Sequence, residues 1–139
     1  MRIPRRTGAG VPSLTERRKG GIVANAVWDA LDGVREVEIT VTGRRTGRQI
    51  THPVWFVLDE DSVFLVPVTG SDSQWYKNVR QIPMIEVSAN GTALSSSATP
   101  ITEADRVNHV VELFKAKYGA DTVERSYPKH DVAVQVPLG

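Results

Sequence analysis

Residues 35–42 read REVEITVT, and the segments GRRTGR (43–48) and QITHPVWFVL (49–58) follow directly. In the first segment Val37, Ile39 and Val41 alternate with polar residues, which predicts a strand with one buried face. The glycines of GRRTGR allow the chain to turn, so a second strand should run from about Arg48 to Leu58. Because the end of that strand, VWFVL, is apolar on both faces, we expect it to be central in its sheet.

Four further strands are expected later in the chain, at residues 63–68, 84–89, 92–99 and 132–136. Pro67 cannot donate to a strand ladder, so the strand that contains it should be interrupted or lie at an edge. Asn90-Gly91 is a strong hairpin signal between two of the segments. Because the strands follow one another as hairpins and not as βαβ units, the pattern favours an antiparallel barrel or sheet surrounded by helices.

Three helices are predicted around these strands. Ala24, Val27, Trp28 and Leu31 form one apolar stripe, which Gly33 would end. A short helix at 74–82 is ended by Pro83. The clearest helix should start at Thr102, since Thr102-x-x-Asp105 resembles a capping box, and Gly119 should close it. Its buried stripe is expected to contain Val107, Val110, Val111, Phe114 and Tyr118. Residues 120–130 are interpreted as a polar linker.

The length of 139 residues suits a flexible basic arm at 1–12 followed by a single domain at 13–139. Residues 1–48 contain ten Lys and Arg against five Asp and Glu, so an anionic membrane, a phosphate or nucleic acid could meet this half, or the arm is simply solvated. Nucleic acid is not favoured, because the arm lacks interleaved aromatic residues. The absence of an apolar signal segment predicts a cytoplasmic protein. With no cysteine, disulfides and thiolate chemistry are excluded.

The turn Gly43-Arg44-Arg45-Thr46-Gly47-Arg48 carries three guanidinium groups between two predicted strands. Arginine binds oxyanions through its planar fork, and glycine-flanked N–H groups can add to such a site. The turn is therefore a candidate phosphate site. The alternative is an ordinary charged β-turn.

The second candidate region leaves a buried strand at Val68, passes through the loop 69–73 (TGSDS) and enters the helix that starts QWYKN. A helix N-terminus presents free N–H groups to an anion or to the edge of a polar ring. The alternative is a normal N-cap with Trp75 as a core anchor. The histidines His52, His109 and His130 lack ligand-like neighbours, so no metal site is predicted.

Taken together, TGRRTGR, PVWFVL, VFLVPVTGSDSQWYKNV and P-x-I-x-V resemble the deazaflavin-dependent nitroreductases, a family of split β-barrel flavoproteins related to pyridoxamine-phosphate oxidases. The resemblance implies a mainly β (α+β) fold, a six-stranded antiparallel split β-barrel with about three flanking helices. It implies a homodimer that binds the deazaflavin coenzyme F-420. The residues that match the family's cofactor site are Arg44, Arg45, Thr46, Gly47, Arg48, Val68, Thr69, Gly70, Ser71, Trp75, Lys77 and Asn78.

The resemblance predicts an oxidoreductase that passes a hydride to a small electrophilic acceptor such as a quinone, a nitro compound or an enone. No catalytic residue is assigned, because the cofactor supplies the chemistry. Many family members have Gly-Gly where this chain has Gly70-Ser71, and the added Cβ bears on how closely the loop approaches the ring. FMN is the alternative cofactor, and a non-catalytic flavin-binding or ligand-binding protein is the alternative function.

Overall fold

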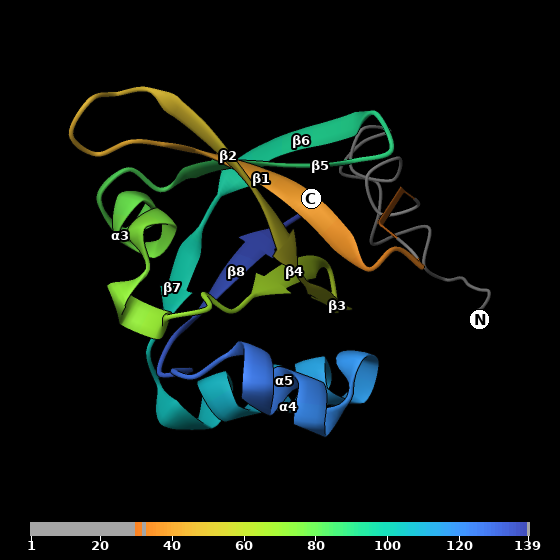
Figure 1. Ribbon diagram of the computed structural model, residues 1–139. Coiled ribbons are helices and arrows are strands. Elements are labelled where there is room, and N and C mark those ends of the chain that lie inside the picture. The colour runs from red at the N-terminus through yellow and green to blue at the C-terminus, as the bar shows by residue number, and fades with distance from the viewer. Residues whose placement is uncertain (1–29, 32, 139) are drawn as a thin grey trace.

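The computed structural model describes residues 30–31 and 33–138, and its strands form two four-stranded antiparallel sheets (Figure 1). The first sheet has the order β2-β1-β5-β6, with β1 at Glu36–Thr42, β2 at Gln49–Trp55, β5 at Met84–Ala89 and β6 at Thr92–Ser97. The second has the order β3-β4-β8-β7, with β3 at Val57–Asp59, β4 at Ser62–Leu65, β7 at Thr99–Ile101 and β8 at Ala133–Pro137. The predicted basic arm and most of the predicted first helix lie outside the described residues.

The described residues form eight strands where six were expected, because two of the predicted segments bend and pass from one sheet to the other. Phe56 separates β2 from β3, and Ala98 separates β6 from β7. Both residues are buried, so each bend turns around an apolar side chain. The six-stranded barrel was therefore wrong in its strand count, although each predicted segment does contain a strand.

The second predicted strand was also misplaced within its sheet. The VWFVL segment is apolar on both faces, yet β2 and β3 each lie at an edge of their sheets. Both faces of this segment are apolar because successive side chains around the bend at Phe56 point into two different apolar cores. β4 ends at Leu65, before Pro67, as the missing N–H of proline predicted.

The hairpin at Asn90-Gly91 is confirmed. Ala89 pairs with Thr92, and the two turn residues have φ values of 52° and 78°. Two consecutive positive φ angles match the right-handed twist of the flanking strands, and Asn and Gly adopt them most readily. This turn fixes the register of β5 against β6.

The described helices are α3 at Gln74–Gln81, α4 at Ala104–Tyr118 and α5 at Ala120–Ser126. The predicted stripe of α4 is buried and Gly119 ends the helix with φ 99°. The predicted capping box is wrong, because Glu103 is the N-cap and makes no side-chain capping bond. The predicted linker at 120–130 is also wrong, since α5 forms there and buries Val123.

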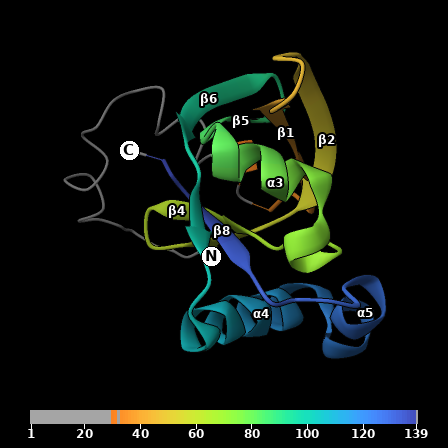
Figure 2. The same ribbon diagram turned by 90° about the vertical axis from the view of Figure 1, so that its left-hand side faces the viewer.

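Two apolar clusters lie on the two faces of the second sheet. One fills the space between the sheets and beside α3, and it includes Ile39, Val63 and Val134. The other lies under α4 and α5 and includes Phe64 and Phe114. The helices α4 and α5 cover the sheet face that is remote from the first sheet (Figures 1 and 2). Within the described ranges, no helix is long and apolar enough to cross a membrane.

Candidate functional site

The arginine-rich turn and helix α3 meet in the structure, although they are far apart in the sequence. Asn78 Oδ1 accepts hydrogen bonds from the Arg44 backbone N–H at 3.1 Å and from Arg44 Nη1 at 2.8 Å. Arg44 Nη2 donates to Gln74 Oε1 at 2.9 Å. The turn between β1 and β2 and the first turns of α3 lie side by side in both ribbon views (Figures 1 and 2). The two predicted site motifs therefore form one surface.

Both side chains that hold Arg44 are neutral amides. The guanidinium is thus oriented without being neutralised, and it keeps its full charge for an anionic ligand. Asn78 is only 4% exposed, so its position is fixed by packing. Arg44 is a link between two elements as well as a source of positive charge.

The turn has its own hydrogen bonds, which set its shape. Gly43 N–H donates to the Arg48 carbonyl at 2.8 Å, and Arg48 N–H donates to Thr46 Oγ1 at 3.2 Å. Gly47 has φ 75°, a conformation that favours glycine. Arg45 and Arg48 are exposed. The turn therefore presents two free-standing arginine side chains beside the anchored Arg44.

The loop that precedes α3 contains a short 3₁₀ helix at Gly70–Asp72, and residues 129–131 hold it from the side. Asp131 accepts hydrogen bonds from Ser71 N–H at 3.0 Å and from Ser71 Oγ at 2.7 Å. Lys129 Nζ pairs with Asp72 Oδ2 at 2.9 Å, and Thr69 forms a parallel bridge with Lys129. Val68, directly before the loop, is 52% exposed. An apolar side chain is thus available next to an anchored backbone loop.

These contacts shift the titration of the groups around the loop. Partial burial alone would raise the pKa of Asp131, but its hydrogen bonds from Ser71 and the charge of Lys129 lower it below its ordinary value. Burial, together with the charge of Asp131, raises the pKa of Tyr76 against the opposing effect of Arg80. Asp131 is therefore a carboxylate and Tyr76 a neutral phenol at neutral pH.

The remaining predicted residues of α3 differ in how deeply their side chains are buried. Trp75 and Tyr76 are 7% and 2% exposed and belong to the core between the sheets. Lys77 is half-buried. Trp75 thus has the packing role that was the alternative to ligand contact, and only a small part of its surface can meet a ligand.

Sequence reasoning missed Gln74, Lys129 and Asp131. Gln74 stands next to the recognised motif, so its proximity was a usable signal. Lys129 and Asp131 lie just before β8, and the residues around them in the sequence give no sign that they contact a loop. Their partners lie 57 and 60 residues away in the chain, and only the fold brings them together.

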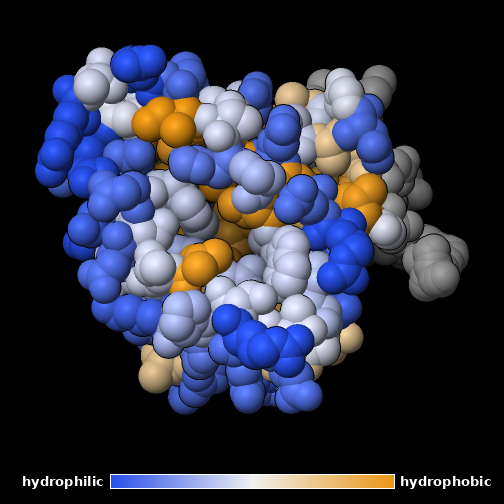
Figure 3. Space-filling view, viewed as in Figure 1, coloured by the Kyte–Doolittle hydropathy of each residue, from blue (hydrophilic) through white to orange (hydrophobic). Residues whose placement is uncertain are grey.

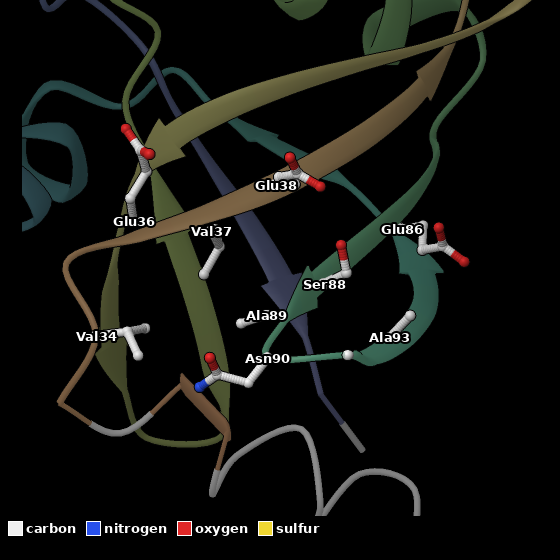
Figure 4. Close-up of a pocket in the computed structure, with 10 residues that line it drawn as sticks. Val34, Glu36, Val37, Glu38, Glu86, Ser88, Ala89, Asn90 and Ala93 are labelled. Atoms are coloured by element: carbon white, nitrogen blue, oxygen red, sulfur yellow. The ribbon is translucent and has the colours of Figure 1, made fainter.

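A separate pocket of about 490 Å³ lies on the outer face of the first sheet, near the β5–β6 hairpin (Figure 4). Its lining includes the carboxylates Glu36, Glu38 and Glu86, and it contains none of the predicted cofactor residues. Three negative charges would repel a phosphate. The pocket therefore does not compete with the arginine turn as an anion site.

The donor set around the turn fits a phosphate-bearing cofactor. Arg44 is charged and held by neutral partners, and Arg45 and Arg48 are exposed. The exposed Val68 offers an apolar surface at the start of the loop that leads to α3. The face seen in Figure 3 is mostly hydrophilic, with only a few separate hydrophobic groups. Within the described part of the chain, no group of three or more His, Asp or Glu residues is placed to hold a metal ion.

Solved structures share this fold. An F420-H2 dependent reductase, FDR-A, aligns with a TM-score of 0.59 and 21% identity over 73% of this chain and 93% of its own. The protein Rv2991 from Mycobacterium tuberculosis aligns with a TM-score of 0.64 and 16% identity over 80% and 77%. A third structure, described as a domain-swapped dimer, has a TM-score of 0.59 and 22% identity over 88% and 92%.

No curated protein matches the sequence. A family model described as F420H(2)-dependent quinone reductase matches residues 14–138, which include both site motifs and all described strands. A match of this extent shows the family and, with it, dependence on the reduced deazaflavin coenzyme. The chain belongs to the F420H2-dependent quinone reductase family.

Proposed function

We propose that this protein reduces a small electrophilic acceptor, such as a quinone, a nitro compound or an activated enone, at the expense of the reduced deazaflavin. The observation that carries the proposal is the direct link from Arg44 to Gln74 and Asn78. This link joins the candidate phosphate-binding turn to the helix that follows the candidate ring-binding loop. One coenzyme can then contact both motifs.

The residues of this chain would bind and orient the coenzyme. Arg45 and Arg48 would contact its phosphate, and Arg44 would add charge from a fixed position. Thr46 and Gly47 shape the turn, while Val68, Thr69, Gly70 and Ser71 would lie along the ring. Lys77, Asn78 and the small exposed part of Trp75 would complete the same surface from α3. The bound coenzyme supplies the hydride.

The proposal is tested by titrating the purified protein with F420 and with FMN while absorbance and fluorescence are followed. We expect saturable binding of the deazaflavin. Binding of FMN alone would assign the protein to the flavin-dependent alternative, and binding of neither would contradict the proposal. Turnover is then measured with reduced coenzyme and a panel of quinones, nitro compounds and enones. Tight binding without turnover of any acceptor would favour the carrier alternative.

A double variant tests the phosphate contacts. Arg45→Ala with Arg48→Ala should weaken coenzyme binding by at least tenfold, because charge-assisted bonds to phosphate contribute about 1.5–3 kcal/mol each. The matched control is Arg106→Ala with Arg125→Ala, which removes two exposed arginines from α4 and α5. Equal losses in both double variants would show that only net charge matters and would contradict the assignment of the turn.

We also propose that the protein is a homodimer, on the ground that a structural neighbour is described as a domain-swapped dimer. Light scattering after size-exclusion chromatography checks this directly. A mass near twice 15.3 kDa is expected, and a mass near 15.3 kDa at all concentrations would contradict it.

A further inference from the structure

The loop at Gly70–Asp72 is held mainly by residues that follow α5. Its internal hydrogen bonds run from Gly70 N–H to the Pro67 carbonyl, from Asp72 N–H to Thr69 and from Ser73 N–H to Gly70. A single 3₁₀ turn of this length is not stable on its own. The contacts with residues 129–131 therefore decide whether this conformation persists.

Asp131 makes the closest of these contacts. Its two carboxylate oxygens accept from the N–H and the hydroxyl of the same residue, Ser71, at 3.0 and 2.7 Å. Its carboxylate also lies so close to Gly70 that a Cβ there would overlap it. Asp131 thus favours glycine at position 70, where a Cβ would overlap its carboxylate, and serine at position 71, whose hydroxyl donates a hydrogen bond to it.

The Ser71 hydroxyl donates a hydrogen bond to Asp131, so the serine side chain helps to hold the loop in place. A preorganised loop loses less conformational freedom when it binds a ligand, which strengthens binding.

We infer that Asp131 is a positioning residue, which acts through Ser71 to hold loop 69–72 in the conformation that receives the deazaflavin ring. The inference rests on the proposed function. It assigns a role in the site to a carboxylate that the family resemblance did not include. Asp131 need not touch the coenzyme to act in this way.

Simple electrostatics makes the opposite prediction. The coenzyme is anionic, so removing a nearby negative charge should strengthen its binding. If Asp131 instead acts by positioning the loop, Asp131→Ala should weaken binding, and we expect about tenfold, which is about 1.4 kcal/mol. Asp131→Asn should recover much of the affinity, because an amide can accept from the Ser71 N–H and donate to its hydroxyl.

Ser71→Ala and the double variant test whether the two residues act together. If they do, Ser71→Ala should weaken binding, and its combination with Asp131→Ala should add little beyond Asp131→Ala alone. The control is Asp105→Ala, which removes an exposed carboxylate from the first turn of α4. It should leave coenzyme affinity unchanged.

Hydrogen exchange of the protein without coenzyme separates this inference from the proposed function. Asp131→Ala should speed exchange of the amides at 70–73, while the amides of β5 exchange as in the wild type. Unchanged exchange at 70–73 would overturn the inference whatever the binding data show. Faster exchange with unchanged or tighter binding would overturn the positioning role. Failure of the wild type to bind any coenzyme would instead refute the proposed function, and with it any role of Asp131 in binding.

Discussion

Replacing glycine by alanine should lower the free energy of unfolding by different amounts at Gly70 and at Gly91. Both have positive φ, 60° and 78°, so alanine is strained at either site. Around Gly91 a Cβ would meet nothing within 4 Å, whereas at Gly70 it would overlap Asp131 and lie 2.9 Å from Lys129 Cγ. Gly91→Ala should therefore lower the free energy of unfolding by about 1–2 kcal/mol. Gly70→Ala should lower it by roughly 2–5 kcal/mol, since overpacking adds to the strain.

Urea denaturation of the two glycine variants measures this difference. Equal losses would show that the loop moves away from Asp131 at little cost. That result would also weaken the case that residues 129–131 hold the loop firmly.

Single residues of the site were predictable from the sequence only where their neighbours in the chain carried the signal. Arg44 and Asn78 stand in recognisable motifs, and the structure joins them by hydrogen bonds. Asp131 carries no local signal, because its role depends on Ser71, 60 residues earlier. A pattern of hydrophobic and polar residues cannot report such a long-range polar contact.

At the scale of elements, the backbone N–H and C=O groups at the bend between β2 and β3 have no strand partner among the described residues and need other hydrogen-bond partners. Phe56 lies in neither strand, yet its backbone is buried. The Tyr118 hydroxyl at the end of α4 accepts from Phe56 N–H at 3.1 Å and lies 2.9 Å from the Phe56 carbonyl and 2.7 Å from the Arg35 carbonyl. Lys117 Nζ also donates to the Phe56 carbonyl at 2.9 Å. One end of α4 thus satisfies the backbone at the bend.

Tyr118→Phe should therefore lower the free energy of unfolding by about 1–3 kcal/mol, because a buried N–H loses its acceptor. The matched control is Tyr127→Phe. Tyr127 is also buried, but its hydroxyl makes no hydrogen bond with the described residues. Chemical denaturation should show little change for Tyr127→Phe. Equal losses for both variants would mean that ring packing, and not the hydroxyl, stabilises the bend.

Lys117 gives this bend a pH dependence. Its Nζ lies 3.5 Å from the centroid of the Phe56 ring, and burial, followed by the charge of Arg35, lowers its pKa to about 8. In the unfolded chain the pKa returns to its ordinary value of 10.5. Between these values the unfolded state binds more protons than the folded state, so this group makes stability rise with pH.

Lys117→Met keeps the length of the side chain and removes this titration. The unfolding free energy of the wild type minus that of the variant should increase from pH 7.5 to pH 9.5, as measured by urea denaturation at each pH. A difference that is flat, or that falls with pH, would show that the folded-state pKa of Lys117 is not lowered.

Most elements were predictable because their patterns are local. The alternation in β1, the stripe of α4 and the Asn90-Gly91 turn each specify one element. The bends at Phe56 and Ala98 were not predictable, because a strand that changes sheets keeps its apolar character throughout. The helix α5 was missed because only Val123 faces the core within its length, too little to show a period.

For the whole molecule, the second sheet is the element that both cores share. One face of β4 and β8 packs against the first sheet and the other packs against α4, so both faces are buried. The candidate site lies outside both cores, where the β1–β2 turn contacts α3 (Figure 2). The exposed arginines there add charge without adding to either core, so binding and stability should be separable.

A thermal unfolding experiment tests that separation. Coenzyme at a concentration 100 times its Kd should stabilise the folded state by about 2.7 kcal/mol. For a domain of this size, that corresponds to a rise in Tm of roughly 5–10 °C. The double variant Arg45→Ala with Arg48→Ala should melt within about 2 °C of the wild type without coenzyme, since both side chains are exposed. At the same coenzyme concentration it should show a much smaller rise. A lower Tm of the free variant would show that the turn also stabilises the fold, and an undiminished rise would show that the phosphate binds elsewhere.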